Sequence, residues 1–136
     1  MSKTSLELLS EARYVLLTTY RRAQNAAGTG EPVSTPVWVA PDDDRLLVMT
    51  QGATGKAKRI RHTSRVTLQQ CSASGKPFVG APVVDAMATI LTGPDAISLR
   101  DAAFTKKYGF QFRFIRWSHR KRSSDAIVVA LRLAAQ

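Results

Sequence analysis

The feature of this sequence that most restricts its fold is a succession of short strand-like runs separated by turns. Each run is rich in β-branched and aromatic residues or alternates apolar with polar side chains, as strands do. The expected strands are Tyr14–Tyr20, Val33–Ala40, Arg45–Thr50, Val66–Cys71, Phe78–Leu91 and Ile127–Leu133. We expect the first three to form an antiparallel meander. This order favours a mainly β fold, a small antiparallel β-barrel with flanking helices, over a doubly wound parallel sheet.

Helix signals lie before, between and after these runs. Thr4 followed by Glu7 is a capping box, which predicts a helix over residues 5–12. Thr54 is a natural N-cap for a helix over Lys56–His62. Gly93-Pro94 opens a third helix that ends near Tyr108. Phe110, Phe114 and Trp117 recur at helical spacing and indicate a further helical piece.

Proline and turn residues mark where the strands should be interrupted. Pro36 predicts an edge or a bulge in its strand, and Pro82 predicts a bend or bulge in another. Tight turns are expected at Pro41–Asp44 and Ser72–Pro77. The chain shows no internal repeat and no low-complexity linker, so we expect residues 1–136 to form a single domain.

Charge is the unusual part of the composition. Twenty Lys and Arg stand against ten Asp and Glu, for a net charge of +10, which points to an anionic partner. Cys71 is the only cysteine and the two histidines lie far apart, so neither a disulfide nor a metal site is predicted. No apolar run approaches the roughly 20 residues of a membrane span. The N-terminal segment does not resemble a signal peptide, and we expect a cytoplasmic protein.

The segment Met49–Arg61 carries the clearest functional signal. A strand ends in the hydroxyl residue Thr50, a glycine-containing loop follows, and a helix then begins around Thr54 and Lys56. Unpaired amides, the helix dipole, a hydroxyl and a lysine together make a phosphate-binding site. The spacing is not that of a Walker A loop. The alternative is a solvated basic helix with an ordinary cap, and the local pattern does not separate the two.

The order of the strands around this segment resembles the pyridoxamine 5′-phosphate oxidase-like split-barrel superfamily, with its FMN-binding-like split β-barrel. More closely, it resembles the short actinobacterial deazaflavin-dependent oxidoreductases, over about residues 8–133. The resemblance implies that Thr50, Thr54 and Lys56 hold the phosphate of a flavin-like cofactor. It also implies that the preceding strand offers backbone groups to the ring, at Ser34, Thr35, Pro36, Val37 and Trp38.

Departures from the oxidase pattern bear on the cofactor. Flavin mononucleotide oxidases of the superfamily usually have Ser-Arg-Lys where this chain has Thr54-Gly55-Lys56. The pyridoxamine-gripping Arg-x-His motif also has no counterpart here. The resemblance therefore favours coenzyme F-420, an 8-hydroxy-5-deazaflavin with a phosphate and a polycarboxylate tail, with FMN as the alternative. Lys58, Arg59 and Arg61 would then line a groove for the tail, although solvent exposure of Arg61 is the plainer interpretation.

The resemblance further implies hydride transfer to a small organic acceptor in a homodimer. The predicted walls of the substrate space are Val37, Trp38, Met49 and Phe78, with core packing the equal alternative for Trp38. No catalytic residue is predicted, and Tyr20 and Tyr108 are proton-donor candidates by type alone.

Two other functions remain open. Residues 106–122 hold seven Lys or Arg, no acid and several aromatics, a mixture that nucleic-acid-binding barrels also use. Helical spacing of those aromatics makes nucleic-acid binding the less favoured interpretation. The second open function is non-catalytic binding of F-420, FMN or heme.

Overall fold

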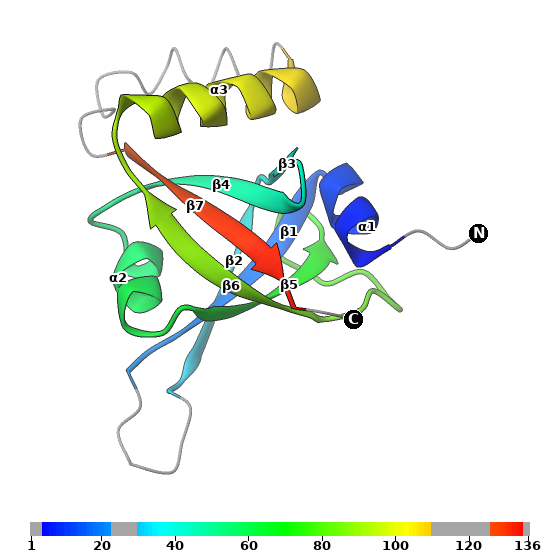
Figure 1. The fold of residues 1–136 in the computed structure, drawn as a ribbon. Coiled ribbons are helices and arrows are strands. Elements are labelled where there is room, and N and C mark those ends of the chain that lie inside the picture. The colour runs from blue at the N-terminus through cyan, green and yellow to red at the C-terminus, as the bar shows by residue number, and fades with distance from the viewer. Residues whose placement is uncertain (1–3, 23–29, 110–125, 135–136) are drawn as a thin grey trace.

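The strands of the computed structural model form one antiparallel sheet that curls into a barrel (Figure 1). The structure describes residues 4–22, 30–109 and 126–134. The strands in this part of the chain are β1 (Tyr14–Tyr20), β2 (Pro32–Val37), β3 (Ala40–Asp42), β4 (Arg45–Gln51), β5 (Arg65–Cys71), β6 (Val84–Leu91) and β7 (Ala126–Leu133). Their order is β2-β1-β5-β6-β7-β4-β3, and each neighbouring pair is antiparallel. The predicted mainly β barrel with flanking helices is confirmed.

Only two residues connect the strands at opposite ends of this order. β2 ends at Val37 and β3 begins at Ala40. Three residue steps of extended chain span at most about 11 Å, so the two ends of the sheet must approach each other. Trp38 and Val39 therefore bring the sheet round into a barrel, and we call these two residues the barrel seam.

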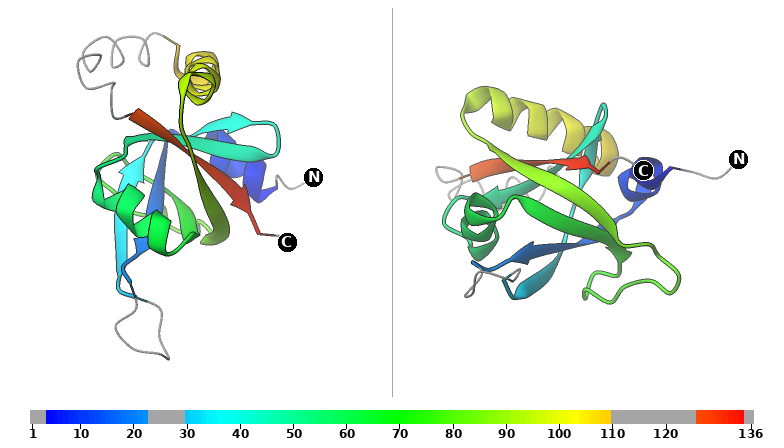
Figure 2. Two further views of the ribbon diagram at one scale, coloured as in Figure 1. Left: turned by 60° about the vertical axis from the view of Figure 1, so that its left-hand side comes forward. Right: turned by 60° about the horizontal axis from the view of Figure 1, so that its bottom comes forward.

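Three helices lie outside the barrel in the described part of the chain: α1 (Ser5–Glu11), α2 (Gly55–His62) and α3 (Pro94–Tyr108). Helix α3 packs across β3, β4 and β7, whereas α2 packs on β1 and β6. Figures 1 and 2 show α1 and α2 on opposite sides of the barrel, with α3 over a third side.

Strand β4 separates two apolar clusters because its side chains alternate between faces. Leu46 and Val48 point into the barrel, where they pack with residues such as Leu17 and Leu131. Leu47 points the other way and packs with Phe104 of α3. The site predicted after β4 therefore begins where a strand buried on both faces ends.

Most predicted elements match the structure closely. Helix α1 has Thr4 as its N-cap, with the Thr4 hydroxyl accepting from the Glu7 amide at 3.1 Å. Helix α3 ends at Tyr108, followed by Gly109 with φ of 60°. Strand β2 lies at one end of the strand order, as Pro36 predicted.

The predicted strand Val33–Ala40 and the predicted meander are wrong. The run breaks at the barrel seam into β2 and β3, because β2 pairs with β1 whereas β3 pairs with β4. Strand β4 pairs with β7 and not with the first two strands. The turn predicted at Pro41–Asp44 is shorter, since β3 continues to Asp42 and the reversal occurs at Asp43, which has φ of 54°.

The predicted strand Phe78–Leu91 is also too long. Its regular part is β6, which begins at Val84. Residues 78–83 form a connection in which Gly80 has φ of 80°, and Pro82 cannot donate to a ladder. The Gln69 side-chain amide fixes this connection by donating to the Ala81 carbonyl at 3.0 Å.

The helical piece predicted at Phe110–Trp117 lies outside the described residues, as does most of the turn-rich connection before Pro32. Within the described residues, no helix has the length and apolar character needed to cross a membrane.

Candidate functional site

The predicted site lies at the passage from β4 into α2. Helix α2 begins at Gly55 with Thr54 as its N-cap, and the Thr54 hydroxyl accepts from the Ala57 amide at 3.3 Å. The amides of Gly55 and Lys56 belong to the first turn and have no acceptor within the helix. The structure thus brings Thr50, Thr54, Gly55 and Lys56 together, as predicted.

The two threonine hydroxyls of this passage form a chain. Thr54 Oγ1 donates to the Gln51 carbonyl at 2.8 Å and lies 3.2 Å from Thr50 Oγ1. Because the Thr54 proton is used on Gln51, Thr50 is the donor in the pair. Thr54 therefore shapes the loop and caps the helix, whereas the Gly55 and Lys56 amides have no partner within the helix.

Two cations of α2 lie over this passage without a carboxylate partner in the described part of the chain. Lys56 is half-buried, and burial and then the nearby Arg59 charge lower the pKa of its ammonium. The pKa of Arg59 is lowered by burial and then by Arg21. An anion bound here would relieve this repulsion and make charge-assisted hydrogen bonds. Lys58, the next lysine of α2, is exposed.

Sequence reasoning missed Thr19, which holds Arg59. Thr19 Oγ1 accepts from Arg59 Nε at 2.6 Å, and the Thr19 side chain is 0% exposed. The available signal was the period of β1, in which Val15, Leu17 and Thr19 share the buried face. A hydroxyl on an otherwise apolar face needs a partner.

Arg61 is exposed, as the plainer interpretation of this residue has it, and its place in a tail groove stays a prediction. Its guanidinium donates to the Gly52 carbonyl at 2.8 Å. This bond connects the 51–54 loop to the second turn of α2, so Arg61 helps to hold the loop in place.

The predicted ring-binding residues divide between the two faces of β2. Ser34 and Pro36 face outward, where the Ser34 hydroxyl lies 2.7 Å from that of Thr18. Thr35 and Val37 face inward, and Val37 packs against the barrel core. The Thr35 hydroxyl oxygen is buried without a hydrogen-bond partner in the described part of the chain. Such a group costs free energy unless something satisfies it.

The side chains of Trp38 and Met49 lie in the cluster under α3, away from Thr50. The Trp38 ring stacks on Tyr108 with centroids 4.3 Å apart and planes at 9°. Phe78, another predicted wall residue, is 52% exposed on the 78–83 connection.

The end of α3 fastens the barrel seam. Lys107 Nζ donates to the Val39 and Ala12 carbonyls, both at 2.6 Å. The Tyr108 hydroxyl lies 3.0 Å from the Val39 carbonyl and 2.9 Å from that of Arg13. Burial lowers the pKa of Lys107 to about 8 and raises that of Tyr108 to about 12. We call Trp38, Val39, Lys107 and Tyr108 the seam latch.

The seam latch also bears on the basic-aromatic segment 106–122. Lys107 and Tyr108 use their polar atoms within the protein, so they do not form a free nucleic-acid-binding surface. The rest of that segment from residue 110 lies outside the described residues.

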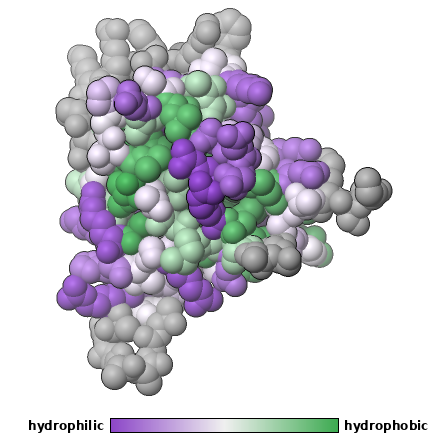
Figure 3. All heavy atoms as spheres, viewed as in Figure 1, coloured by the Kyte–Doolittle hydropathy of each residue, from purple (hydrophilic) through white to green (hydrophobic). Residues whose placement is uncertain are grey.

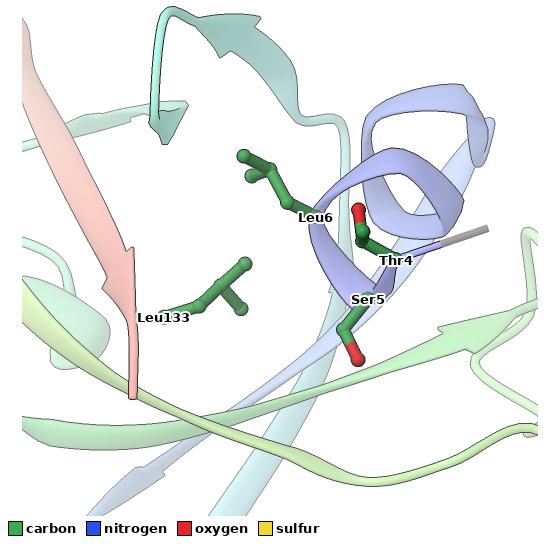
Figure 4. A pocket seen from close by; sticks show the side chains of 4 residues that line it. All are labelled: Thr4, Ser5, Leu6 and Leu133. Atoms are coloured by element: carbon green, nitrogen blue, oxygen red, sulfur yellow. The ribbon is translucent and has the colours of Figure 1, made fainter. Parts of the chain in front are cut away.

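A shallow hollow of about 260 Å³ lies elsewhere, between the start of α1 and the end of β7. Leu6 and Leu133 face it, with Thr4 and Ser5 on the helix side (Figure 4). It lies on the opposite side of the barrel from α2 (Figure 1). In the same view, Figure 3 shows hydrophilic residues over α2, and apolar residues beside a hydrophilic group over the middle of the barrel.

Comparison with known proteins gives little at the level of sequence. No family model matches the chain. A stretch of 45 residues is 42% identical to part of the atromentin synthetase greA of Suillus grevillei, and covers 30% of this chain and 5% of that protein. A stretch of 40 residues is 42% identical to part of the atromentin synthetase invA1 of Paxillus involutus, and this stretch covers 4% of that protein. The chain thus corresponds to about a twentieth of the curated proteins it matches.

Solved structures show the fold. A putative pyridoxamine 5′-phosphate oxidase of Listeria innocua aligns over 96% of this chain and 90% of its own, with a TM-score of 0.58 and 12% identity. An FAD-binding protein of Mesorhizobium loti aligns over 98% of this chain and 91% of its own, with a TM-score of 0.64 and 18% identity. An F420 reductase aligns over 98% of this chain and 97% of its own, with a TM-score of 0.59 and 15% identity.

Two more solved structures have a similar fold. The heme storage protein HutZ of Vibrio cholerae aligns with a TM-score of 0.64 and 14% identity, over 96% of this chain and 87% of its own. A protein of unknown function from Agrobacterium tumefaciens aligns with a TM-score of 0.68 and 17% identity. The alignment covers 96% of this chain and 54% of that protein. The chain has the split-barrel fold of pyridoxamine 5′-phosphate oxidase-like proteins.

Proposed function

We propose that this protein is an oxidoreductase that binds reduced coenzyme F-420 and serves hydride transfer to a small organic acceptor. The observation that carries the proposal is the half-buried pair of cations, Lys56 and Arg59, over the open amides at the start of α2. The fold is shared with proteins described as an F420 reductase, an FAD-binding protein and a putative pyridoxamine 5′-phosphate oxidase. When bound, the deazaflavin supplies the hydride.

The residues of this chain would bind the two ends of such a cofactor. The amides of Gly55 and Lys56 and the Lys56 ammonium meet the phosphate, with Thr50 and Thr54 shaping the loop beneath it. Lys58 and Arg59 lie next along α2, where Lys58 would meet the tail carboxylates. Backbone groups from Ser34 to Trp38 border the ring, and Met49 supports this wall from the α3 side.

Two features of the structure fit a flavin-like cofactor. The phosphate end has cations without carboxylates in the described part of the chain, which suits an anion. The ring end has the buried, unpartnered Thr35 hydroxyl on the inward face of β2. A ring carbonyl or ring N–H would satisfy that hydroxyl.

The test is a parallel titration of the purified protein with oxidised F-420, FMN and heme. We expect F-420 to bind at micromolar concentration or tighter and more tightly than FMN. Failure of all three ligands to bind at micromolar levels would sink the proposal. A turnover assay with reduced F-420 and a panel of enones then separates an enzyme from a non-catalytic carrier.

A non-catalytic binder of F-420, FMN or heme is the alternative. The similarity to HutZ favours including heme in the titration. His62 is exposed and its Nδ1 lies 3.0 Å from an Arg22 guanidinium nitrogen. A neutral His62 that accepts from Arg22 carries its proton on Nε2, so it is poorly prepared to ligate iron. His119 lies outside the described residues.

We also propose that the protein acts as a homodimer. The large apolar side chains most exposed in the described part of the chain lie near one another in sequence, at Phe78, Val79, Val83 and Met87. A patch of this kind on a small barrel suits a subunit interface. Light scattering should give twice the chain mass, and Val83→Asp should shift it toward one chain mass. A wild-type protein with the mass of one chain at high concentration contradicts this proposal.

A further inference from the structure

The side chain of Arg59 turns back toward the first turn of α2. Its Nε donates to the buried Thr19 hydroxyl, and this bond fixes the guanidinium against the barrel wall. A Cβ atom added at Gly55 would lie 2.7 Å from one of the terminal guanidinium nitrogens of Arg59. With Arg59 in this position, a side chain at residue 55 would require the guanidinium to shift.

Thr19 is placed for this task. It is fully buried on the inward face of β1, where its neighbours on the same face are Val15 and Leu17. Its hydroxyl has a long contact of 3.5 Å with the Val33 carbonyl and a short one of 2.6 Å with Arg59 Nε. A buried hydroxyl would be costly without partners, so the short bond to Arg59 is its main compensation.

The terminal nitrogens of Arg59 have no carboxylate partner among the described residues. Lys56 lies one turn earlier on α2, and the charges of Lys56 and Arg59 repel each other. Arg21 adds a third cation nearby and is itself 4.0 Å from Glu31, an exposed pair. A fixed guanidinium beside an unpaired lysine is a better ligand for an oxyanion than for solvent, because guanidinium N–H groups bind phosphate and carboxylate in pairs.

We propose that Arg59 is a ligand for the cofactor phosphate, and that Thr19 and Gly55 are its positioning residues. This inference rests on the proposed function and makes it more specific. Arg59 contributes a planar donor pair on the phosphate, next to the single positive charge of Lys56. Gly55 is required because it leaves room for that guanidinium, in addition to any role in the loop.

The experiment compares phosphorylated and phosphate-free ligands of the same ring: FMN with riboflavin, and F-420 with 8-hydroxy-5-deazariboflavin. Fluorescence titration gives the ratio of the two Kd values for each pair. Wild type should favour the phosphorylated member, and Arg59→Gln should reduce that preference about tenfold, as expected for loss of one charge-assisted contact. Arg132→Gln is the matched control, since Arg132 pairs with Asp44 on the exposed face of β7.

The positioning residues are tested without removing any charge. Gly55→Ala should displace Arg59 and reduce the preference for phosphate severalfold, while the melting temperature stays level or rises because alanine favours a helix. Thr19→Val should reduce the preference similarly, and Thr19→Ser, which keeps the hydroxyl, should restore it. A purely structural role for these residues would instead lower the affinities for both ligands of a pair together.

The outcomes separate the two proposals. If Lys56→Ala lowers the phosphate preference but Arg59→Gln and Gly55→Ala do not, the role of Arg59 is wrong and the proposed function stands. If Arg59→Gln weakens both ligands of a pair equally, the role of Arg59 is also wrong. If the wild-type protein binds none of the four ligands, the proposed function and this inference fail together.

Discussion

Lys56 and Lys107 are both partly buried lysines with lowered pKa values, yet their surroundings differ. Lys107 donates to two backbone carbonyls and belongs to the seam latch, where the polar atoms meet partners within the protein. Lys56 has no hydrogen-bond or ion-pair partner in the described part of the chain, and the nearby charge that lowers its pKa is that of another cation, Arg59. The difference indicates that Lys107 serves the fold, whereas Lys56 makes no such contact in the described part of the chain.

The largest effect should come from breaking the latch. Trp38→Ala removes the ring stacked on Tyr108. We expect the free energy of unfolding to fall by about 3 kcal/mol, because truncation of a large aromatic side chain costs this much. Chemical denaturation measures the loss. Affinity for F-420 should change little at a temperature where the variant is folded, since only backbone groups of Trp38 border the ring. A large loss of affinity with unchanged stability would instead place the Trp38 side chain in the site.

The cation at the start of α2 should show the reverse pattern. Lys56→Ala should weaken F-420 binding at least tenfold, because a hydrogen bond to a charged group contributes about 1.5–3 kcal/mol. Stability should be unchanged or slightly higher, since a cation repelled by Arg59 is removed. Titration and thermal melting measure the two effects, with Lys76→Ala on the exposed 72–76 turn as the control. Unchanged affinity in Lys56→Ala would move the phosphate site elsewhere.

The two threonine N-caps allow a finer comparison. Thr54→Ala and Thr4→Ala each remove a cap, and each should lower stability by about 1 kcal/mol. Only Thr54→Ala should also weaken F-420 binding severalfold, because Thr54 shapes the loop at the start of α2. Parallel melts and titrations of the two variants measure this. Equal affinities in both variants would reduce Thr54 to an ordinary cap.

The last comparison concerns pH and the latch. The unfolded chain keeps the Lys107 proton up to about pH 10.5, whereas the folded chain releases it near 8 because burial lowers the pKa. Between these values the unfolded state binds more protons, so Lys107 makes stability rise with pH. Denaturation of wild type and Lys107→Met at pH 7, 8, 9 and 10 should show the difference moving in favour of wild type. A pH-independent difference contradicts the lowered pKa.

Local patterns predicted much of the fold and the centre of the site. Thr54 as a cap, Lys56 in the first turn and Thr50 at the strand end are adjacent in sequence, so helix and strand signals alone bring them together. Thr19 was missed because it lies forty residues from Arg59 in the chain. Trp38 was placed in a continuous strand because the break at the barrel seam comes from pairing with two different strands, which the local pattern does not contain.

The sequence by itself determined where most of the described strands and helices lie, where α2 begins, and that the protein carries an excess of positive charge. Propensity, capping and alternation are local, so they can be inferred from neighbouring residues. Only the tertiary structure decided which of those charges meet partners within the described part of the fold and which do not. Lys107 reaches the carbonyls of Ala12 at the end of α1 and of Val39 in the seam. Arg61 reaches the loop before its own helix, and Lys56 and Arg59 lie together at the first turn of α2. That division depends on contacts between residues far apart in the chain, and charge counts do not contain it.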